Sequence, residues 1–68
     1  MDLETLLQNY FGCKKPFRKN GQLTKSGDGA VQQLMFLIEA LSMVGIITED
    51  TCKQAMRNID NIIDSNHY

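Results

Sequence analysis

The first hydrophobic repeat along the chain predicts a short helix over residues 3–11. Apolar side chains recur there at helical spacing and fall on one stripe of the helix surface: Leu3, Leu6, Leu7, Tyr10 and Phe11. Asp2 stands where an N-cap residue accepts a hydrogen bond from the first turn. Gly12 stands where a residue of left-handed conformation ends a helix. The sequence therefore carries a capping signal at both ends of this helix.

Residues 13–29 are predicted to form a connection without regular helix. Pro16 disfavours helical backbone at the residue before it. The run Ser-Gly-Asp-Gly at 26–29 is typical of a break followed by a helix start, with Asp28 as the expected N-cap. The next helix is therefore expected to begin at residue 30.

A tight turn is predicted in the middle of this connection. Asn20 and Gly21 form the pair preferred in a type I′ hairpin turn, because both residues tolerate a positive φ angle. The flanking segments 17–19 and 22–24 could pair as two very short strands. An ordered loop is the alternative, since a hairpin this small is marginally stable on its own.

The densest run of apolar residues predicts a central helix over residues 30–44. Its first apolar face consists of Val31, Leu34, Met35, Ile38 and Leu41. Its second apolar face consists of Phe36, Ala40 and Met43, flanked by Leu37 and Val44. A helix that is apolar nearly all round is usually buried on both sides. Two other helices can hardly cover it in a chain of 68 residues.

The second face of this central helix is therefore the candidate contact surface for a protein partner or a second copy of the chain. Residues at this spacing form a ridge that can pack against another helix. The residues expected at the interface are Phe36, Ala40, Met43 and Val44. The alternative is that helix 3–11 and the connection cover this face within one chain.

A third helix is predicted over residues 49–64, with Thr48 as its N-cap. Its apolar residues fall within one arc of about 120°: Cys52, Ala55, Met56, Ile59, Ile62 and Ile63. Glu49 precedes Lys53 by one turn, a spacing that suits an ion pair. The short connection makes the last two helices an antiparallel αα-hairpin, with helix 3–11 packed across it. We therefore predict a small all-α domain of three helices spanning residues 1–68.

Charge is distributed unevenly along the chain, although the formal net charge is only −1. Five of the seven basic residues lie in one segment without acidic residues: Lys14, Lys15, Arg18, Lys19 and Lys25. This basic loop, with Phe17 among its cations, could bind the phosphates of DNA or RNA and stack on a base, or bind an acidic protein. The alternative is a solvated loop whose charges offset the acidic helices.

Residue patterns for catalysis and metal binding are missing. Cys13 with His67 is the only pairing of a nucleophile with a base, and it joins a loop to the end of the chain. Cys13, Cys52 and His67 also lack the spacing of a zinc site. We therefore expect neither an enzyme nor a cofactor.

The chain is expected to be a cytoplasmic protein. It begins with acidic residues where a signal peptide is basic, and it lacks the run of about 20 apolar residues that spans a membrane. Two cysteines fit free thiols better than a disulfide framework. Small intracellular proteins of this kind are common in phages and other mobile elements, so the frequency of such proteins, and no residue of this chain, makes that origin one possibility.

These patterns together favour a non-catalytic protein–protein interaction module. We expect a small regulator or inhibitor that acts by occupying a partner's surface, and that forms a homodimer through the second face of helix 30–44. The alternative is a nucleic-acid-binding accessory protein that uses the basic loop over residues 14–25.

Overall fold

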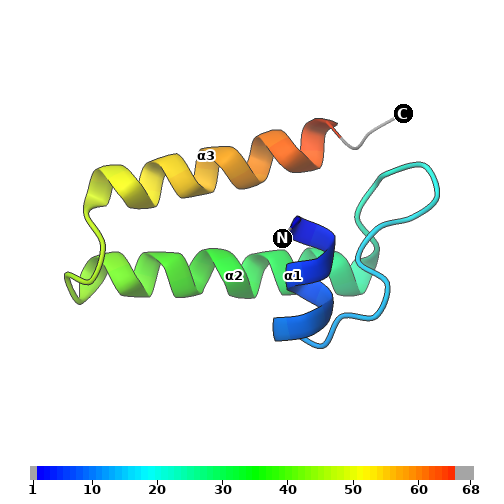
Figure 1. Ribbon diagram of the computed structural model, residues 1–68, viewed down its shortest axis with the longest axis horizontal. Helices are drawn as coiled ribbons and strands as arrows, with labels where there is room; N and C mark the ends of the chain where they lie inside the picture. Colours follow the sequence, from blue (N-terminus) through cyan, green and yellow to red (C-terminus); the bar gives the residue numbers. More distant parts are fainter. Residues whose placement is uncertain (1, 66–68) are drawn as a thin grey trace.

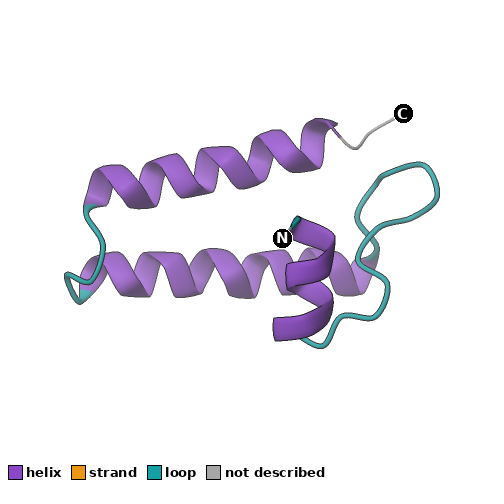
Figure 2. Ribbon diagram, viewed as in Figure 1, coloured by secondary structure: helices purple, strands orange, loops and turns teal. Residues whose placement is uncertain are grey.

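The computed structural model describes residues 2–65, and this part of the chain consists of three α-helices joined by irregular segments (Figures 1 and 2). Helix α1 spans Leu3–Tyr10, α2 spans Lys25–Met43 and α3 spans Glu49–Ser65. Helices α2 and α3 lie side by side and antiparallel, and α1 crosses α2 near the end where α2 begins (Figure 1). The prediction of a small all-α fold with a C-terminal helical hairpin is confirmed.

The ends of α1 carry the predicted signals. The Asp2 carboxylate accepts a hydrogen bond from the Thr5 N–H at 2.8 Å. Gly12 adopts a φ angle of 66°, and the Cys13 N–H donates to the Leu7 carbonyl at 3.1 Å. The helix thus ends in a left-handed glycine, as such helices commonly do.

The start of α2 differs from the prediction. The helix begins at Lys25 instead of residue 30, and its N-cap is Thr24, not Asp28. The Thr24 hydroxyl accepts a hydrogen bond from the Gly27 N–H at 3.0 Å, which satisfies a backbone group in the first turn. The predicted connection over residues 13–29 is therefore shorter, and the Ser-Gly-Asp-Gly run belongs to α2.

Gly27 marks a close approach of two backbone segments and not a break in the helix. A Cβ atom at this position would lie 2.8 Å from the Pro16 carbonyl carbon and closer still to its oxygen. The Thr24 N–H donates to that Pro16 oxygen at 2.9 Å, and the Thr24 hydroxyl donates to the Lys15 carbonyl at 2.6 Å. These contacts hold the segment around Lys15 and Pro16 against the first turn of α2.

The basic loop contains one isolated antiparallel bridge, between Phe17 and Leu23, and no longer strand pairing within residues 2–65. Both residues are half-buried and pack against the core. The tiny hairpin considered from the sequence is thus reduced to a single bridge, and the ordered loop is the better description.

The turn at the tip of the basic loop is not of type I′. Gly21 has a φ angle of 86°, but across residues 2–65 positive φ is confined to glycines, so Asn20 does not adopt it. The Gly21 N–H donates to the Arg18 carbonyl at 2.9 Å, and the Arg18 N–H donates to the Gln22 carbonyl at 2.7 Å. This pattern is the three-residue hairpin loop that ends in a bulged glycine.

The connection between α2 and α3 follows the predicted signals closely. Gly45 adopts a φ angle of 81°, and the Ile46 N–H donates to the Leu41 carbonyl at 2.9 Å, which closes α2 in a Schellman arrangement. Thr48 caps α3 by accepting a hydrogen bond from the Thr51 N–H at 3.1 Å. The predicted ion pair on α3 also forms, with 3.4 Å between the charged atoms of Glu49 and Lys53.

The core lies at the end of the molecule where α1 crosses α2. All three helices and the segment after α1 contribute buried side chains: Leu3, Leu7, Cys13, Ala30, Val31 and Ile59. Half-buried apolar residues surround them, among them Leu34 and Ile38 of α2. Cys52 is also buried, on the apolar side of α3. Within residues 2–65, no helix is both long and apolar enough to cross a membrane.

Candidate interaction surface on α2

The residues predicted to form the contact surface of the central helix are all exposed. Phe36 is 65 % exposed, Met43 87 % and Val44 70 %, and Ala40 is also exposed. Two further apolar side chains extend this area. We name the whole set the α2 apolar surface: Phe36, Leu37, Ala40, Met43, Val44 and Ile46.

The position of the other elements explains this exposure. Helix α3 packs on the side of α2 that carries Leu34, Ile38 and Leu41, which are half-buried. Phe36, Ala40 and Met43 lie on the opposite side, within an arc of about 60° at 3.6 residues per turn. Helix α1 and the basic loop lie beside the first half of α2 and do not reach its second half (Figure 1).

Charged side chains flank the α2 apolar surface but do not lie within it. Glu39 is the one charged residue in the second half of α2. It lines a shallow hollow between α2 and α3, together with Glu49 and Lys53 of α3. The α2 apolar surface is therefore a continuous uncharged area, bordered on the N-terminal side by Gln32 and Gln33.

The five cations of the basic loop are exposed, as the sequence predicts for a binding or solvated segment. Among the described residues, the one ion pair joins Glu49 and Lys53 and uses none of these cations. The hydrogen bond from the Thr24 hydroxyl to the Lys15 carbonyl places the Lys15 backbone next to the start of α2, where Lys25 lies.

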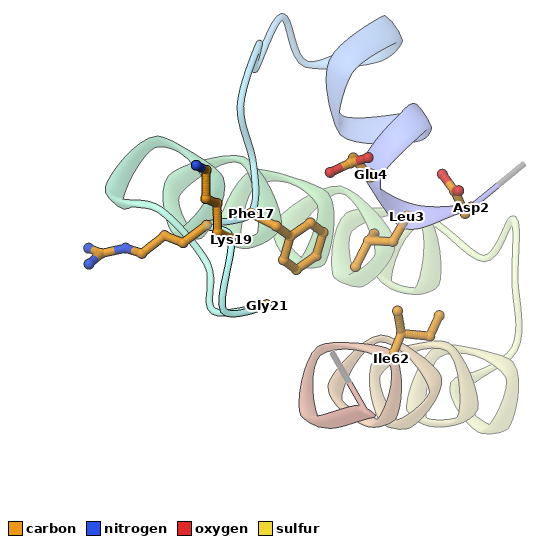
Figure 3. Close-up of a pocket in the computed structure, with 8 residues that line it drawn as sticks. Asp2, Leu3, Glu4, Phe17, Lys19, Gly21 and Ile62 are labelled. Carbon is orange, nitrogen blue, oxygen red and sulfur yellow. The ribbon is translucent and has the colours of Figure 1, made fainter. Parts of the chain in front are cut away.

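Phe17 does not project from the basic loop as a stacking platform. Its ring points toward Leu3 of α1 and Ile62 of α3, at the wall of a pocket of about 310 Å³ (Figure 3). Asp2 and Glu4 of α1 lie on the other side of this pocket from the loop. The predicted stacking of Phe17 on a base therefore has no support in its position.

One acidic group beside this pocket is perturbed by its hydrogen bond. The Thr5 N–H donates to the Asp2 carboxylate, and this bond holds the pKa of Asp2 below its ordinary value of 3.8. The side chain is fully exposed, so the effect belongs to helix capping.

The two cysteines are free thiols and both are buried. Cys13 is a core residue, and its thiol donates a hydrogen bond to the Ser26 hydroxyl at 3.6 Å. His67, the only candidate base, lies outside the described residues. The described part of the chain holds no group of three or more metal-binding side chains.

Two parts of this arrangement were missed by sequence reasoning. The first is that Ile46 belongs to the exposed apolar surface, although the sequence pattern places it only in the connection between two helices. The signal for it is the pair Ile46-Ile47 directly after Gly45, which makes this end of the helical hairpin apolar. The pocket that places Asp2 and Glu4 opposite Lys19 depends on how the loop folds over α1. No local pattern in the sequence could indicate this pocket.

Comparison of the chain with family models, curated proteins and solved structures finds no match.

Proposed function

We propose that this chain is a non-catalytic protein–protein interaction module that binds another polypeptide through the α2 apolar surface. One observation carries the proposal: Phe36, Met43 and Val44 are 65–87 % exposed on the folded chain. Single exposed apolar side chains are common, but a contiguous exposed apolar area of a few hundred Å² often marks an interaction site. A small regulator or inhibitor works in this way, by occupying the surface of its partner.

Burial of the exposed side chains would supply free energy on the scale that binding requires. Five large apolar residues of this surface are 50–87 % exposed. Full burial of one such side chain contributes about 1.5–3 kcal/mol, so covering the five contributes roughly 5–10 kcal/mol. The partner contributes a similar amount, and together these gains offset an association cost of about 4–15 kcal/mol.

The chemistry of this surface restricts the partner. No charged side chain lies within the α2 apolar surface, so a charged group on the partner would lose its water without gaining an ion pair. Phe36, Ala40 and Met43 are spaced four and three residues apart. Side chains at this spacing form a ridge that fits the groove of another helix. The best partner is therefore an uncharged, apolar helical surface.

A photo-crosslinking experiment tests this function. A photoreactive phenylalanine analogue at position 36 should give an adduct with a defined polypeptide on irradiation of the producing cells. The adduct should disappear in the Met43→Glu variant, which should keep its fold because the side chain at position 43 is 87 % exposed. The matched control carries the analogue at Gln54, which is exposed on α3. Equal labelling from both positions, or labelling that survives Met43→Glu, would refute the proposal.

We also propose that the module acts in the cytoplasm. The support is chemical: two buried thiols remain unpaired, and extracellular compartments favour disulfides in chains this small.

A second candidate function is a nucleic-acid-binding accessory role for the basic loop over residues 14–25. The supporting observation is that its five cations are exposed and outside the ion pair formed on α3. If all five cations contact phosphates of duplex DNA, the logarithm of the binding constant should fall with the logarithm of the salt concentration with a slope of about −4.5.

Fluorescence titrations of DNA and RNA at several salt concentrations test this second function. Alanine at Lys14, Lys15, Arg18 and Lys19 should abolish binding, whereas alanine at Lys53, an exposed cation on α3, should leave it unchanged. If the wild-type chain binds neither polymer at low salt, the basic loop has no such role.

A further inference from the structure

Four of the five large side chains of the α2 apolar surface are arranged symmetrically around one small residue, Ala40. Phe36 and Leu37 stand four and three residues before Ala40, and Met43 and Val44 stand three and four residues after it. All of these residues lie in α2 or directly at its end, and all are exposed. The spacing is therefore unchanged when the direction of the helix is reversed about Ala40.

This symmetry suits antiparallel packing of two identical helices. A two-fold axis places the same surface patch on both copies, so residue i of one meets residue j of the other and the reverse. With the axis at Ala40, Phe36 of each copy meets Val44 of the other, and Leu37 meets Met43. Ala40 meets its own counterpart, where a small side chain allows the helix axes to approach to about 8–10 Å.

We infer that the polypeptide that covers the α2 apolar surface is a second copy of this chain, in an antiparallel dimer with its two-fold axis at Ala40. The inference rests on the proposed binding function of that surface and names its partner. Both partners then meet the requirement for an uncharged helical surface, because both contribute the same uncharged residues.

Charge favours the antiparallel arrangement over the parallel one. Lys25 lies fifteen residues before Ala40, or about 22 Å along a helix, so antiparallel pairing separates the two basic loops by about 45 Å. Parallel pairing places these loops side by side, with five exposed cations each. Asp2, Glu4 and Asp28 lie at the same end of the chain and offset part of this charge, so repulsion between the two loops disfavours parallel pairing only weakly.

The apolar area matches a small dimer interface. The eight large side chains paired across the axis, four from each copy, are two-thirds exposed on average and together offer roughly 300–650 Å² of apolar surface, at about 60–120 Å² for each fully buried side chain. A small specific interface buries about 1,200 Å², of which about 60 % is apolar. The dimer therefore lies at the lower end of the range for stable interfaces, and we expect a micromolar dissociation constant.

Light scattering on the purified chain tests self-association. At about 1 mM the wild-type chain should have twice the 7.7 kDa mass of one copy, and it should dissociate on dilution. Met43→Glu should raise the dissociation constant at least 100-fold, with unchanged helical circular dichroism, because it places two carboxylates in an apolar interface. Gln54→Glu, on the exposed side of α3, should leave the dimer unchanged.

Disulfide trapping tests the arrangement of the two copies. Ala40→Cys should form a covalent dimer on mild oxidation, and so should a mixture of the Phe36→Cys and Val44→Cys chains. Phe36→Cys alone should not, because the two positions are about 12 Å apart along the antiparallel helices. The wild-type chain, whose two cysteines are buried, is the background control. Efficient trapping of Phe36→Cys alone would show parallel pairing and overturn the inference.

Failure of this inference is distinguishable from failure of the proposed function. A chain that is monomeric at 1 mM, or a dimer that persists in Met43→Glu, overturns the inference. If photo-crosslinking from position 36 then labels a different polypeptide in a Met43-dependent manner, the interaction module stands with another partner. If the analogue labels the chain itself, both hold.

Discussion

Replacing Gly27 with alanine tests the contact that joins the segment after α1 to α2. A Cβ atom at position 27 would lie 2.8 Å from the carbonyl carbon of Pro16 and 2.9 Å from its Cα. These neighbours are backbone atoms, which cannot rotate away as a flexible side chain can. The substitution therefore forces the Pro16 segment and the first turn of α2 apart.

The size of the effect follows from two opposing contributions. Alanine stabilises a helix by about 1 kcal/mol relative to glycine. Overpacking costs about 1–3 kcal/mol, and separation of the segments also weakens two hydrogen bonds from Thr24, to the Pro16 and Lys15 carbonyls, each worth about 1 kcal/mol. We expect Gly27→Ala to lower the free energy of unfolding by about 2–4 kcal/mol, against a total of about 3–10 kcal/mol for a chain of this length.

Gly29 offers a matched control two residues further along α2. A Cβ atom there has no neighbour within 4 Å, so Gly29→Ala gains the helix preference without a clash. We expect this variant to be more stable than the wild type by about 1 kcal/mol, which raises Tm by about 4–8 °C in a domain of this size. Gly27→Ala should lower Tm by about 8 °C or more.

Thermal and urea unfolding, followed by circular dichroism at 222 nm, measure both variants. The informative quantity is the difference between them, because helix preference contributes equally to each. If Gly27→Ala is as stable as Gly29→Ala, then the Pro16 backbone does not lie against α2, and the contact at Gly27 does not account for the start of this helix at Lys25.

Other predictions concern the core and the helix ends. Leu7→Ala should lower the free energy of unfolding by about 2–5 kcal/mol, because this side chain is fully buried. Leu37→Ala should lower it much less, because Leu37 is half exposed, and urea unfolding of both variants measures the difference. Thr48→Ala should cost about 1 kcal/mol by removing the α3 N-cap, and Thr48→Ser should restore most of it. Acid should destabilise α1, because folding lowers the pKa of Asp2. The contribution of Asp2 to stability is therefore present above pH 3.8, and it is lost as the pH falls through the pKa of the folded state. NMR titration should show this, and Asp2→Asn should remove the dependence.

Local signals were sufficient to predict most of the helices. Asp2, Gly12, Gly45 and Thr48 each act on backbone groups within one helical turn, so their roles are visible in a short stretch of sequence. The start of α2 could not be predicted in this way. It depends on the contact between Gly27 and a distant segment, which compensates for the weak helix preference of two glycines.

The candidate surface was predictable in part. The excess of apolar residues on helix α2 indicated that a face would remain uncovered, since few other residues were present to cover it. Which half of α2 is covered depends on where α1 and the basic loop pack, and this follows from the whole fold (Figure 1). The inward position of Phe17 has the same origin, because its bridge to Leu23 fixes the side on which the ring lies.

The core occupies only one end of the helical hairpin, and this asymmetry makes stability uneven along α2. The buried cluster draws on Ala30 and Val31 in its first half, while the second half packs on the start of α3, where Cys52 is the buried residue. Amide protons around Leu41 should therefore exchange with solvent through local opening, at a lower free energy than those around Val31. Binding of a polypeptide to this half would raise the free energy of that local opening, so slower exchange around Leu41 would report recognition directly.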